Sequence, residues 1–247
     1  MKTVIIDQNP QFNMYATPPH ECSYLPEREA TTVFIDPLFR KDSKIYSTLS
    51  QHGFRRSGEH LYRPQCHSCS ACIPVRLPVA SFTPRRNQLR TWKKNQDLQV
   101  TPNKAAFKQE HFELYQYYLA SRHQGGGMDH PTPESFVHFL TSSWSRTIFY
   151  EFRLQEQLVA VAVADFFDHG LSAVYTFFNP DYAERSLGVF AILWEIEEAK
   201  RLGKTWVYLG YWIKECHKMN YKNQYQPLEY YRQGNWHKDL PSDSSSA

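Results

Sequence analysis

Hydrophobic residues in the second half of the chain first follow the period of a helix. Between residues 105 and 123, apolar side chains return every three or four positions, which predicts an amphipathic helix. The glycines at 125–127 are expected to end this helix. Thr132 is then placed to cap a second helix that runs to about Leu140.

Three β-rich runs follow, at residues 148–154, 158–166 and 171–178, and short polar turns separate them. Runs of this length joined by tight turns predict antiparallel strands in a meander. Residues 186–202 then predict a helix capped by Ser186, and residues 206–211 predict a further strand. A strand, a helix and a strand in this order imply a crossover and a parallel pair, so the predicted sheet is mixed.

The first half of the chain has too many prolines for long helices and predicts short strands and loops. The pattern changes near Lys104. We therefore expect an α+β protein with a small, basic, cysteine-containing N-terminal domain (residues 1–104), a mixed-sheet domain (105–240) and a disordered Ser-rich tail (241–247). The prolines of the first half are Pro18, Pro19, Pro26, Pro37, Pro64, Pro74, Pro78, Pro84 and Pro102.

Composition places the chain among ordinary globular proteins. Of its 247 residues, 41% are hydrophobic and 21% are charged, which excludes the disordered and collagen-like classes. No stretch approaches the roughly 18 to 20 apolar residues that cross a bilayer, and the apolar run within residues 1–9 is too short for a secretory signal. We therefore expect a cytoplasmic protein with no membrane partner. The sequence does not indicate an oligomeric state.

Positive charge is concentrated in the N-terminal half. Residues 1–104 hold 15 Lys and Arg against 8 Asp and Glu, a balance of +7, whereas residues 105–247 hold 13 against 17, a balance of −4. This asymmetry points to a polyanionic partner such as nucleic acid, and the alternative is a solvated basic face without a partner.

Residues 82–94 are the strongest candidate for that contact. Arg85, Arg86 and Arg90 stand close to Trp92 in the sequence, with amide side chains between them. Guanidinium groups match the geometry of phosphates, and an aromatic ring can stack on an unpaired base, so this mixture favours RNA. The alternative is an exposed charged helix.

Four of the five cysteines are candidates to bind a metal. Cys66, Cys69 and Cys72 form a C-x2-C-x2-C run, and Cys22 can supply a fourth thiolate from a distance. Zinc and iron–sulfur clusters both accept such ligands, although the next cysteine of a ferredoxin and the second pair of a zinc ribbon are missing. The alternatives are a redox role and ordinary buried or surface thiols, and we interpret Cys216 as structural.

The turn at residues 185–190 lies between a strand and a helix, where backbone N–H groups can form an anion site. Ser186 and Gly188 belong to a half match with the CoA-binding turn of N-acetyltransferases. Phe190 replaces the last small residue of that turn, and its bulk is expected to obstruct the close approach of a pyrophosphate. The alternative is a simple helix start.

Five strings of residues together point to one family. They are YRPQCHSCSACIPV (62–75), FTPRRNQL (82–89), AVYTFFNPD (173–181), SLGVFAILW (186–194) and VYLGYWI (207–213), the last followed by Lys218 and Met219. In these strings, and over about residues 22–236, the chain resembles the bacterial aspartate/glutamate leucyltransferases, which are relatives of the eukaryotic arginyl-tRNA–protein transferases.

The resemblance implies a C-terminal domain of the N-acetyltransferase (GNAT) type that takes aminoacyl-tRNA in place of acetyl-CoA. It implies transfer of leucine from leucyl-tRNA to proteins that begin with Asp or Glu, which marks them for degradation in the N-degron pathway, with no cofactor required. Eukaryotic relatives have a Cys-x-x-Cys near the N-terminus that has been associated with an iron–sulfur cluster, whereas this chain has Cys22 alone there.

Transfer from an activated ester mainly requires two substrates held in register and a modest base, because an α-amine has a pKa of about 7.7 to 8.0. We predict Asp165 as the proton relay and Tyr175, on the neighbouring strand, as the second candidate. We predict that Arg76 binds the acidic side chain of the acceptor, since bidentate geometry favours arginine.

Residues after the last predicted strand complete the set. Tyr211, Trp212 and Lys218 are predicted to line the leucine pocket or to contact the 3′ end of the tRNA, and aromatic packing against the sheet is the alternative. Three other functions stay open: an arginyl donor in place of leucyl, an N-acetyltransferase that uses acetyl-CoA, and a non-enzymatic zinc protein that binds RNA.

Overall fold

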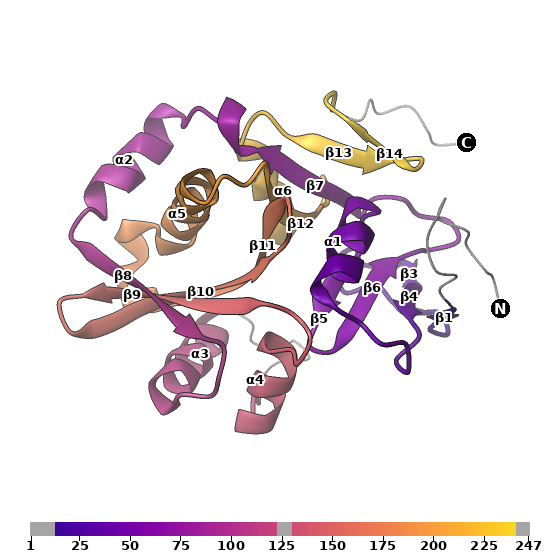
Figure 1. The fold of residues 1–247 in the computed structure, drawn as a ribbon, viewed down its shortest axis with the longest axis horizontal. Helices are drawn as coiled ribbons and strands as arrows, with labels where there is room; N and C mark the ends of the chain where they lie inside the picture. Colours follow the sequence, from indigo (N-terminus) through magenta and orange to yellow (C-terminus); the bar gives the residue numbers. More distant parts are fainter. Residues whose placement is uncertain (1–12, 123–129, 241–247) are drawn as a thin grey trace.

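A small antiparallel sheet forms the N-terminal part of the molecule (Figure 1). The computed structural model describes residues 13–122 and 130–240. Helix α1 begins after Asp42, whose side chain accepts a hydrogen bond from the N–H of Ile45 at 2.8 Å. The elements are β1 (Met14–Ala16), β4 (Thr32–Ile35), α1 (Ser43–Gln51), β5 (Arg55–Ser57) and β6 (His60–Pro64), in the strand order β1-β4-β6-β5, and a separate pair, β2 (His20–Glu21) and β3 (Glu29–Ala30).

A larger mixed sheet forms the body of the molecule. Its strands are β7 (Ile73–Pro78), β8 (Leu98–Lys104), β9 (Thr147–Leu154), β10 (Gln157–Phe166), β11 (Gly170–Phe178), β12 (Trp206–Trp212), β13 (Glu229–Arg232) and β14 (Asn235–His237). They lie in the order β14-β13-β7-β12-β11-β10-β9-β8. The pair β11–β12 is parallel and the other pairs are antiparallel, so the predicted mixed sheet is confirmed.

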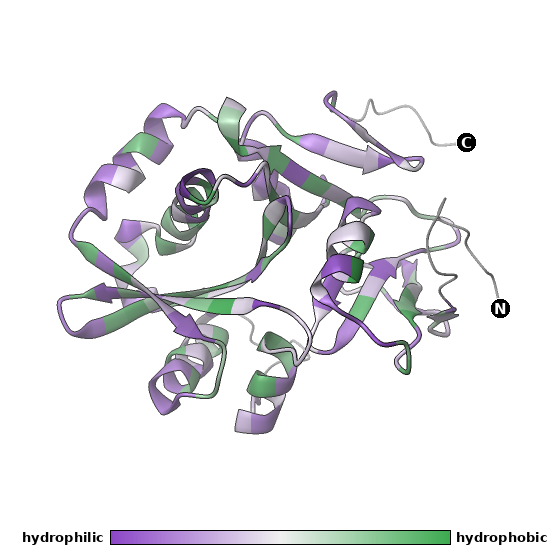
Figure 2. Ribbon diagram, in the orientation of Figure 1, coloured by the Kyte–Doolittle hydropathy of each residue, from purple (hydrophilic) through white to green (hydrophobic). Residues whose placement is uncertain are grey.

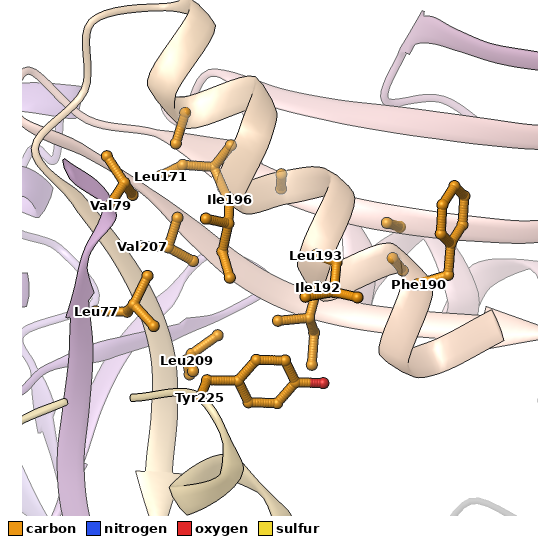
Figure 3. Close-up of a cluster of buried hydrophobic side chains, with 14 of the residues drawn as sticks. Leu77, Val79, Leu171, Phe190, Ile192, Leu193, Ile196, Val207, Leu209 and Tyr225 are labelled. Atoms are coloured by element: carbon orange, nitrogen blue, oxygen red, sulfur yellow. The ribbon is translucent and has the colours of Figure 1, made fainter. Parts of the chain in front are cut away.

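Helices cover both faces of the large sheet, which curls around α5 (Figure 1). Figure 3 shows Ile192 and Ile196 of α5 directed toward Val207 and Leu209 of β12, in the main hydrophobic core. The second core lies under α3 and α4. The helical elements are η1 (Val79–Ser81), α2 (Arg86–Lys94), α3 (Gln109–Arg122), α4 (Pro133–Leu140), η2 (Pro180–Arg185), α5 (Leu187–Arg201), α6 (His217–Asn220) and η3 (Tyr221–Gln224).

The elements predicted in the second half are confirmed. Helix α3 occupies the 105–123 window, and Thr132 caps α4 by accepting a hydrogen bond from the N–H of Ser135 at 3.1 Å. The meander β9-β10-β11 and the crossover through α5 to β12 also lie where the pattern placed them. The glycines at 125–127 and the tail at 241–247 lie outside the described residues.

The large sheet takes strands from both sides of the boundary expected near residue 104. Strand β7 lies between β12 and β13, and β8 forms the far edge beside β9. The sheet therefore crosses that boundary, and the separate N-terminal unit ends at about Pro64, with β6. Within the described ranges, no helix has both the length and the apolar character needed to span a membrane.

Candidate functional site

Strands β11 and β12 stop pairing soon after they meet, and the opening between their unpaired edges, here named the cleft, is the centre of the candidate site. They pair at three positions, the last being Ser172 with Tyr208. Farther along, in the described chain, β11 pairs with β10 alone and β12 with β7 alone. Residues 173–176 are half-buried although β11 is an inner strand. Inner strands normally have every backbone group paired, so this opening leaves backbone groups available to a ligand.

Arg55, on β5, bridges the two strands where they part. Its Nη1 donates hydrogen bonds to Ser172 Oγ at 2.9 Å and to the Tyr208 carbonyl at 3.3 Å, and its Nη2 donates to the Ala173 carbonyl at 2.6 Å. Gly210 lies against this guanidinium with φ of +84°, and a Cβ there would come within 3.3 Å of it. The N-terminal unit therefore supplies the residue that holds the cleft open at its narrow end.

Glu195, on α5, is a fully buried carboxylate near this cleft. Neither of its oxygens has a hydrogen-bond partner among the described residues. Burial raises the pKa of Glu195 to about 8, and the guanidinium of Arg55 acts in the opposite direction. The negative charge of Glu195 raises the pKa of Tyr221 and Tyr225, so the hydroxyls of these two tyrosines lie near Glu195.

Lys222, on η3, is a buried cation in the same region. Its side chain donates to the sulfur of Met219 at 3.3 Å and lies 5.0 Å from the ring centre of Tyr221, and it forms no ion pair with a described residue. Burial lowers the pKa of Lys222 to about 7, and the positive charge of Arg55 acts in the same direction.

The start of α5 and the helix α2 lie side by side (Figure 1). Trp92 packs on Phe190 at 5.3 Å between ring centres, and Asn95 Nδ2 donates to the Arg185 carbonyl at 2.9 Å. Phe190 also packs on Phe152, in the core, so its bulk points away from the turn that it was expected to obstruct. The chain therefore departs from the CoA-binding pattern in the residue type at position 190, but the side chain of Phe190 does not block the turn.

The arginines at the start of α2 and within it are exposed. Arg85, Arg86 and Arg90 form no ion pair in the part of the chain that the structure describes. Figure 2 shows α2 as largely hydrophilic, in contrast to the hydrophobic stretches of β10. Ser186 precedes α5 with φ of 53° and makes no side-chain cap. Its carbonyl accepts from the N–H groups of Val189 and Phe190, so the donors left open in the first turn are those of Leu187 and Gly188. These positions agree with the predicted tRNA contacts, which stay predictions.

Asp165 does not lie in the cleft. Both of its oxygens are bonded to Arg56, at 2.6 and 2.9 Å, and they also accept from Thr147 at 2.6 Å and Tyr46 at 3.0 Å. Both charged side chains are completely buried. A carboxylate whose two oxygens already accept four hydrogen bonds has little capacity left for a substrate proton, so the geometry favours a structural anchor between the two sheets over the predicted proton relay.

Tyr175 faces α3 and α4. Its ring packs on Tyr115, Tyr118 and Phe139, and its hydroxyl has no hydrogen-bond partner among the described residues. Burial raises the pKa of Tyr175 well above its ordinary value, so the hydroxyl keeps its proton near neutral pH, and its predicted role as the second proton-relay candidate stays a prediction.

Arg76 already has its carboxylate partner inside the protein. Its Nη2 lies 2.8 Å from Glu229 Oε2, and its guanidinium lies between the rings of Trp206 and Trp236, at 3.8 and 4.1 Å from their centres. The register of β7 with β13 places the two charges opposite each other, so this geometry corrects the predicted acceptor contact to a cross-strand ion pair.

Tyr211 and Trp212 are also occupied by packing. The Tyr211 hydroxyl donates to the carbonyls of Gly53 and Tyr62, at 3.0 and 3.3 Å, and Trp212 Nε1 donates to the Asn220 carbonyl at 3.2 Å. Both rings are buried, which corrects their predicted place in a leucine pocket. Lys218 is exposed on α6, and its predicted contact with tRNA stays a prediction.

All five cysteines are free thiols, and they gather near α6. Burial raises the pKa of Cys72 to about 12, and the other four sulfurs act in the same direction. No three or more His, Cys, Asp or Glu side chains among the described residues are arranged to hold a metal ion. The predicted zinc or iron–sulfur site at Cys22, Cys66, Cys69 and Cys72 stays a prediction, and no step of the reaction is assigned to it.

Sequence reasoning missed Arg55, Glu195 and Lys222. A signal existed for one of them: Glu195 lies on the apolar side of its helix, between Leu193 and Ile196, where a charge is unexpected. No local sequence pattern distinguishes Arg55 or Lys222 from other basic residues, because the surroundings of both are formed by segments far away in the sequence.

Known proteins resemble the chain along most of its length. The sequence profile for the N terminus of arginine-tRNA-protein transferase matches residues 20–90, and that for the C terminus matches residues 110–232. The aspartate/glutamate leucyltransferase of Pseudomonas fluorescens (strain Pf0-1) is 56% identical over 219 residues, which cover 89% of this chain and 93% of that protein. That of Pseudomonas syringae pv. syringae (strain B728a) is 54% identical over 226 residues, which cover 92% and 96%.

Among solved structures, L-PGS from Bacillus licheniformis is similar to 58% of this chain, with 47% of its own chain covered, a TM-score of 0.45 and 10% identity. A likeness of that size carries no functional weight. The sequence matches do carry weight, because they include strands of both sheets and the residues of the cleft. With both profiles matched and more than half of its residues shared with leucyltransferases along about nine-tenths of its length, the chain belongs to the arginine-tRNA–protein transferase family, with the bacterial aspartate/glutamate leucyltransferases.

Proposed function

We propose that this protein transfers leucine from leucyl-tRNA to the α-amino group of cytoplasmic proteins that begin with Asp or Glu, and so marks them for degradation. The observation that carries the proposal is the identity of 56% over 89% of the chain with a relative named for this activity. The likeness includes the residues that build the cleft between β11 and β12.

The cleft supports the proposal because its unpaired backbone groups can bind an extended substrate. Backbone groups freed where β11 and β12 part can bind the acceptor peptide and donate hydrogen bonds to the oxyanion of the reacting ester. The first turn of α5 offers N–H groups to a phosphate of the tRNA 3′ end. The exposed arginines of α2 extend this basic surface along the tRNA.

Positioning supplies most of the rate in such a reaction. The leucyl ester is already activated, so its carbonyl carbon is attacked by the neutral α-amine, an amide bond forms and the bond to the ribose oxygen breaks. Holding the amine and the ester in register is worth about 7 to 11 kcal/mol in well-oriented systems.

The test is a transfer assay with labelled leucyl-tRNA and four peptides that differ only in residue one: Asp, Glu, Lys and Ala. We expect label on the first two peptides alone. Equal labelling of all four would contradict the proposed specificity. Parallel reactions with arginyl-tRNA and with acetyl-CoA separate the two other acyl donors, and efficient transfer from either in place of leucyl-tRNA would overturn the proposal.

A further inference from the structure

Two buried side chains of opposite charge lie in the cleft region without charged partners. The carboxylate of Glu195 has no hydrogen bond from any described residue, and the ammonium of Lys222 has only the sulfur of Met219. Both are nearly or fully inaccessible to solvent, at 0% and 5% exposure. Buried ionisable groups normally have hydrogen-bonding or charged partners, so two that lack them require an explanation.

Glu195 and Lys222 have neighbours in common. The guanidinium of Arg55, which bridges β11 and β12, acts on the charges of both Glu195 and Lys222. Tyr221 lies 5.0 Å from the Lys222 ammonium, and the charge of Glu195 acts on the same tyrosine. Both groups are therefore within the electrostatic reach of Arg55, the residue that bridges β11 and β12 where they part.

An N-terminal acidic residue carries the complementary charges. Its α-ammonium and its side-chain carboxylate are only a few bonds apart, so one residue presents both charges together. We propose that Lys222 binds the side-chain carboxylate of the acceptor's first residue, and that Glu195 receives its α-ammonium and accepts a proton from it. The inference rests on the proposed function and assigns residues to its acceptor site.

The physical argument is that a bound substrate favours the ionised forms of Glu195 and Lys222, which burial disfavours. Desolvation disfavours the ionised forms of both Glu195 and Lys222. An incoming ammonium favours the carboxylate, and an incoming carboxylate favours the lysine ammonium. A neutral side chain such as that of Gln would leave Lys222 without a partner, which is a strong basis for selecting against it.

The proton balance of the step is complete. The α-ammonium gives one proton to the Glu195 carboxylate and becomes a neutral amine. The amine attacks the ester carbonyl, the new C–N bond replaces the C–O bond to ribose, and the second amine proton goes to the departing ribose oxygen. Glu195 then releases its proton to solvent before the next turnover.

Other titratable groups face the pair. Glu195 is approached by Arg55 from β5, Tyr150 from β9, and Tyr221 and Tyr225 from the segment after α6. Lys222 is approached by Arg55, Tyr221, Cys72 and Cys216. Burial raises the pKa of the tyrosines and of Cys72, so these groups stay neutral between pH 6 and 9.

The first experiment measures kcat/KM for peptides that begin with Glu and with Gln, using wild type, Lys222→Met and Lys44→Met. Lys44 is an exposed lysine of α1 and serves as the matched control. We expect Lys222→Met to lower kcat/KM for the Glu peptide about 10- to 100-fold, the range for a charged hydrogen bond, and to change that for the Gln peptide less than about twofold. Equal losses on both peptides, or an unchanged preference for Glu, would overturn the assignment.

The second experiment follows single-turnover transfer to the Glu peptide by Glu195→Gln between pH 6.5 and 8.5. We expect a loss of about 10²- to 10⁴-fold at pH 6.5 that becomes smaller at pH 8.5, where the α-amine is already neutral. A loss that is the same at every pH contradicts proton transfer. If wild type itself does not distinguish Glu from Gln, the proposed function fails; if only the variants behave otherwise than expected, this inference alone fails.

Discussion

Asp165 and Glu195 are both fully buried carboxylates, and their surroundings differ completely. Asp165 accepts hydrogen bonds from Arg56, Thr147 and Tyr46, whereas Glu195 accepts none from a described residue. A satisfied charge stabilises one arrangement of the chain, while an unsatisfied one costs stability and is kept where a ligand completes it. The two residues therefore separate the anchor of the fold from the chemistry of the site.

Replacement of Asp165 by Asn leaves the Arg56 guanidinium buried and without a negative partner. We expect the free energy of unfolding to fall by about 3 to 5 kcal/mol, as for other broken buried pairs, measured by urea denaturation. Asp168→Asn, at an exposed position in the next turn, is the control. Full stability combined with lost transfer would return Asp165 to the role of proton relay.

Glu195 should make stability depend on pH. Its folded pKa of about 8 lies above the ordinary 4.5, so the folded protein keeps a proton that the unfolded chain releases in this range. Its contribution is fully present below pH 4.5 and is lost as pH rises through 8, by roughly 4 to 5 kcal/mol in all. We expect Glu195→Gln to be more stable than wild type at pH 9 and to differ little at pH 5, measured by urea denaturation at each pH. An equal difference at both values would contradict the burial of this charge.

Helix α2 depends on its contact with the start of α5. Lys94 Nζ donates to the Glu184 carbonyl at 2.8 Å, and Arg185 pairs with Asp97 at 2.8 Å, so the end of α2 is fixed to the turn before α5. At the other end, Gln88 Nε2 donates to the Gln224 carbonyl at 3.2 Å, next to the segment that carries Lys222. The basic helix is therefore held in a set position relative to the cleft.

Removal of two cations from α2 should weaken tRNA binding through the salt-dependent part of the affinity. We expect Arg86→Ala with Arg90→Ala to reduce the slope of log K against log salt by about one for each phosphate that the variant no longer binds. Binding assays at several salt concentrations measure this slope. Lys44→Ala with Lys104→Ala, at exposed positions of α1 and β8, removes the same charge elsewhere. An identical slope for the two double variants would leave α2 as a solvated face.

Local sequence patterns were enough to predict the helices and strands of the second half of the chain. They were not enough to predict the residues of the candidate site. Thr132 is readable because its cap lies within a few residues, and the start of α5 is readable from its period, whereas the predicted side-chain cap at Ser186 does not form. The Arg56–Asp165 pair joins positions 109 residues apart, and Arg55 reaches Ser172 across 117. No periodicity reports such contacts, so a prediction from local signals chose Asp165 for the cleft and overlooked Arg55.

The large sheet is shared by both halves of the chain, so neither half is complete alone. Strand β7 is bonded on one side to β12 and on the other to β13. In addition, Arg56 of the small sheet neutralises Asp165 of the large one. The whole described chain therefore behaves as one cooperative unit in which the two sheets stabilise each other.

A fragment of residues 105–240 lacks β7, α2 and β8 and leaves Asp165 unpaired. We expect this fragment to show no cooperative unfolding transition by circular dichroism. Mixing it with a fragment of residues 1–104 should restore the transition and the transfer activity, since the cut falls between β8 and α3. Cooperative folding of 105–240 alone would instead support two independent domains.

The position of β7 also sets when the protein can become active during its synthesis. Strand β7 ends at Pro78 and β12 begins at Trp206, so 206 − 78 = 128 residues of chain growth separate the strand from its first partner. At about 5 to 20 residues per second, the ribosome takes roughly 6 to 25 seconds over that interval. Lys222 and β13 leave the ribosome later still. A nascent chain therefore has no finished cleft, and an enzyme that consumes charged tRNA is assembled only after its own translation is nearly complete.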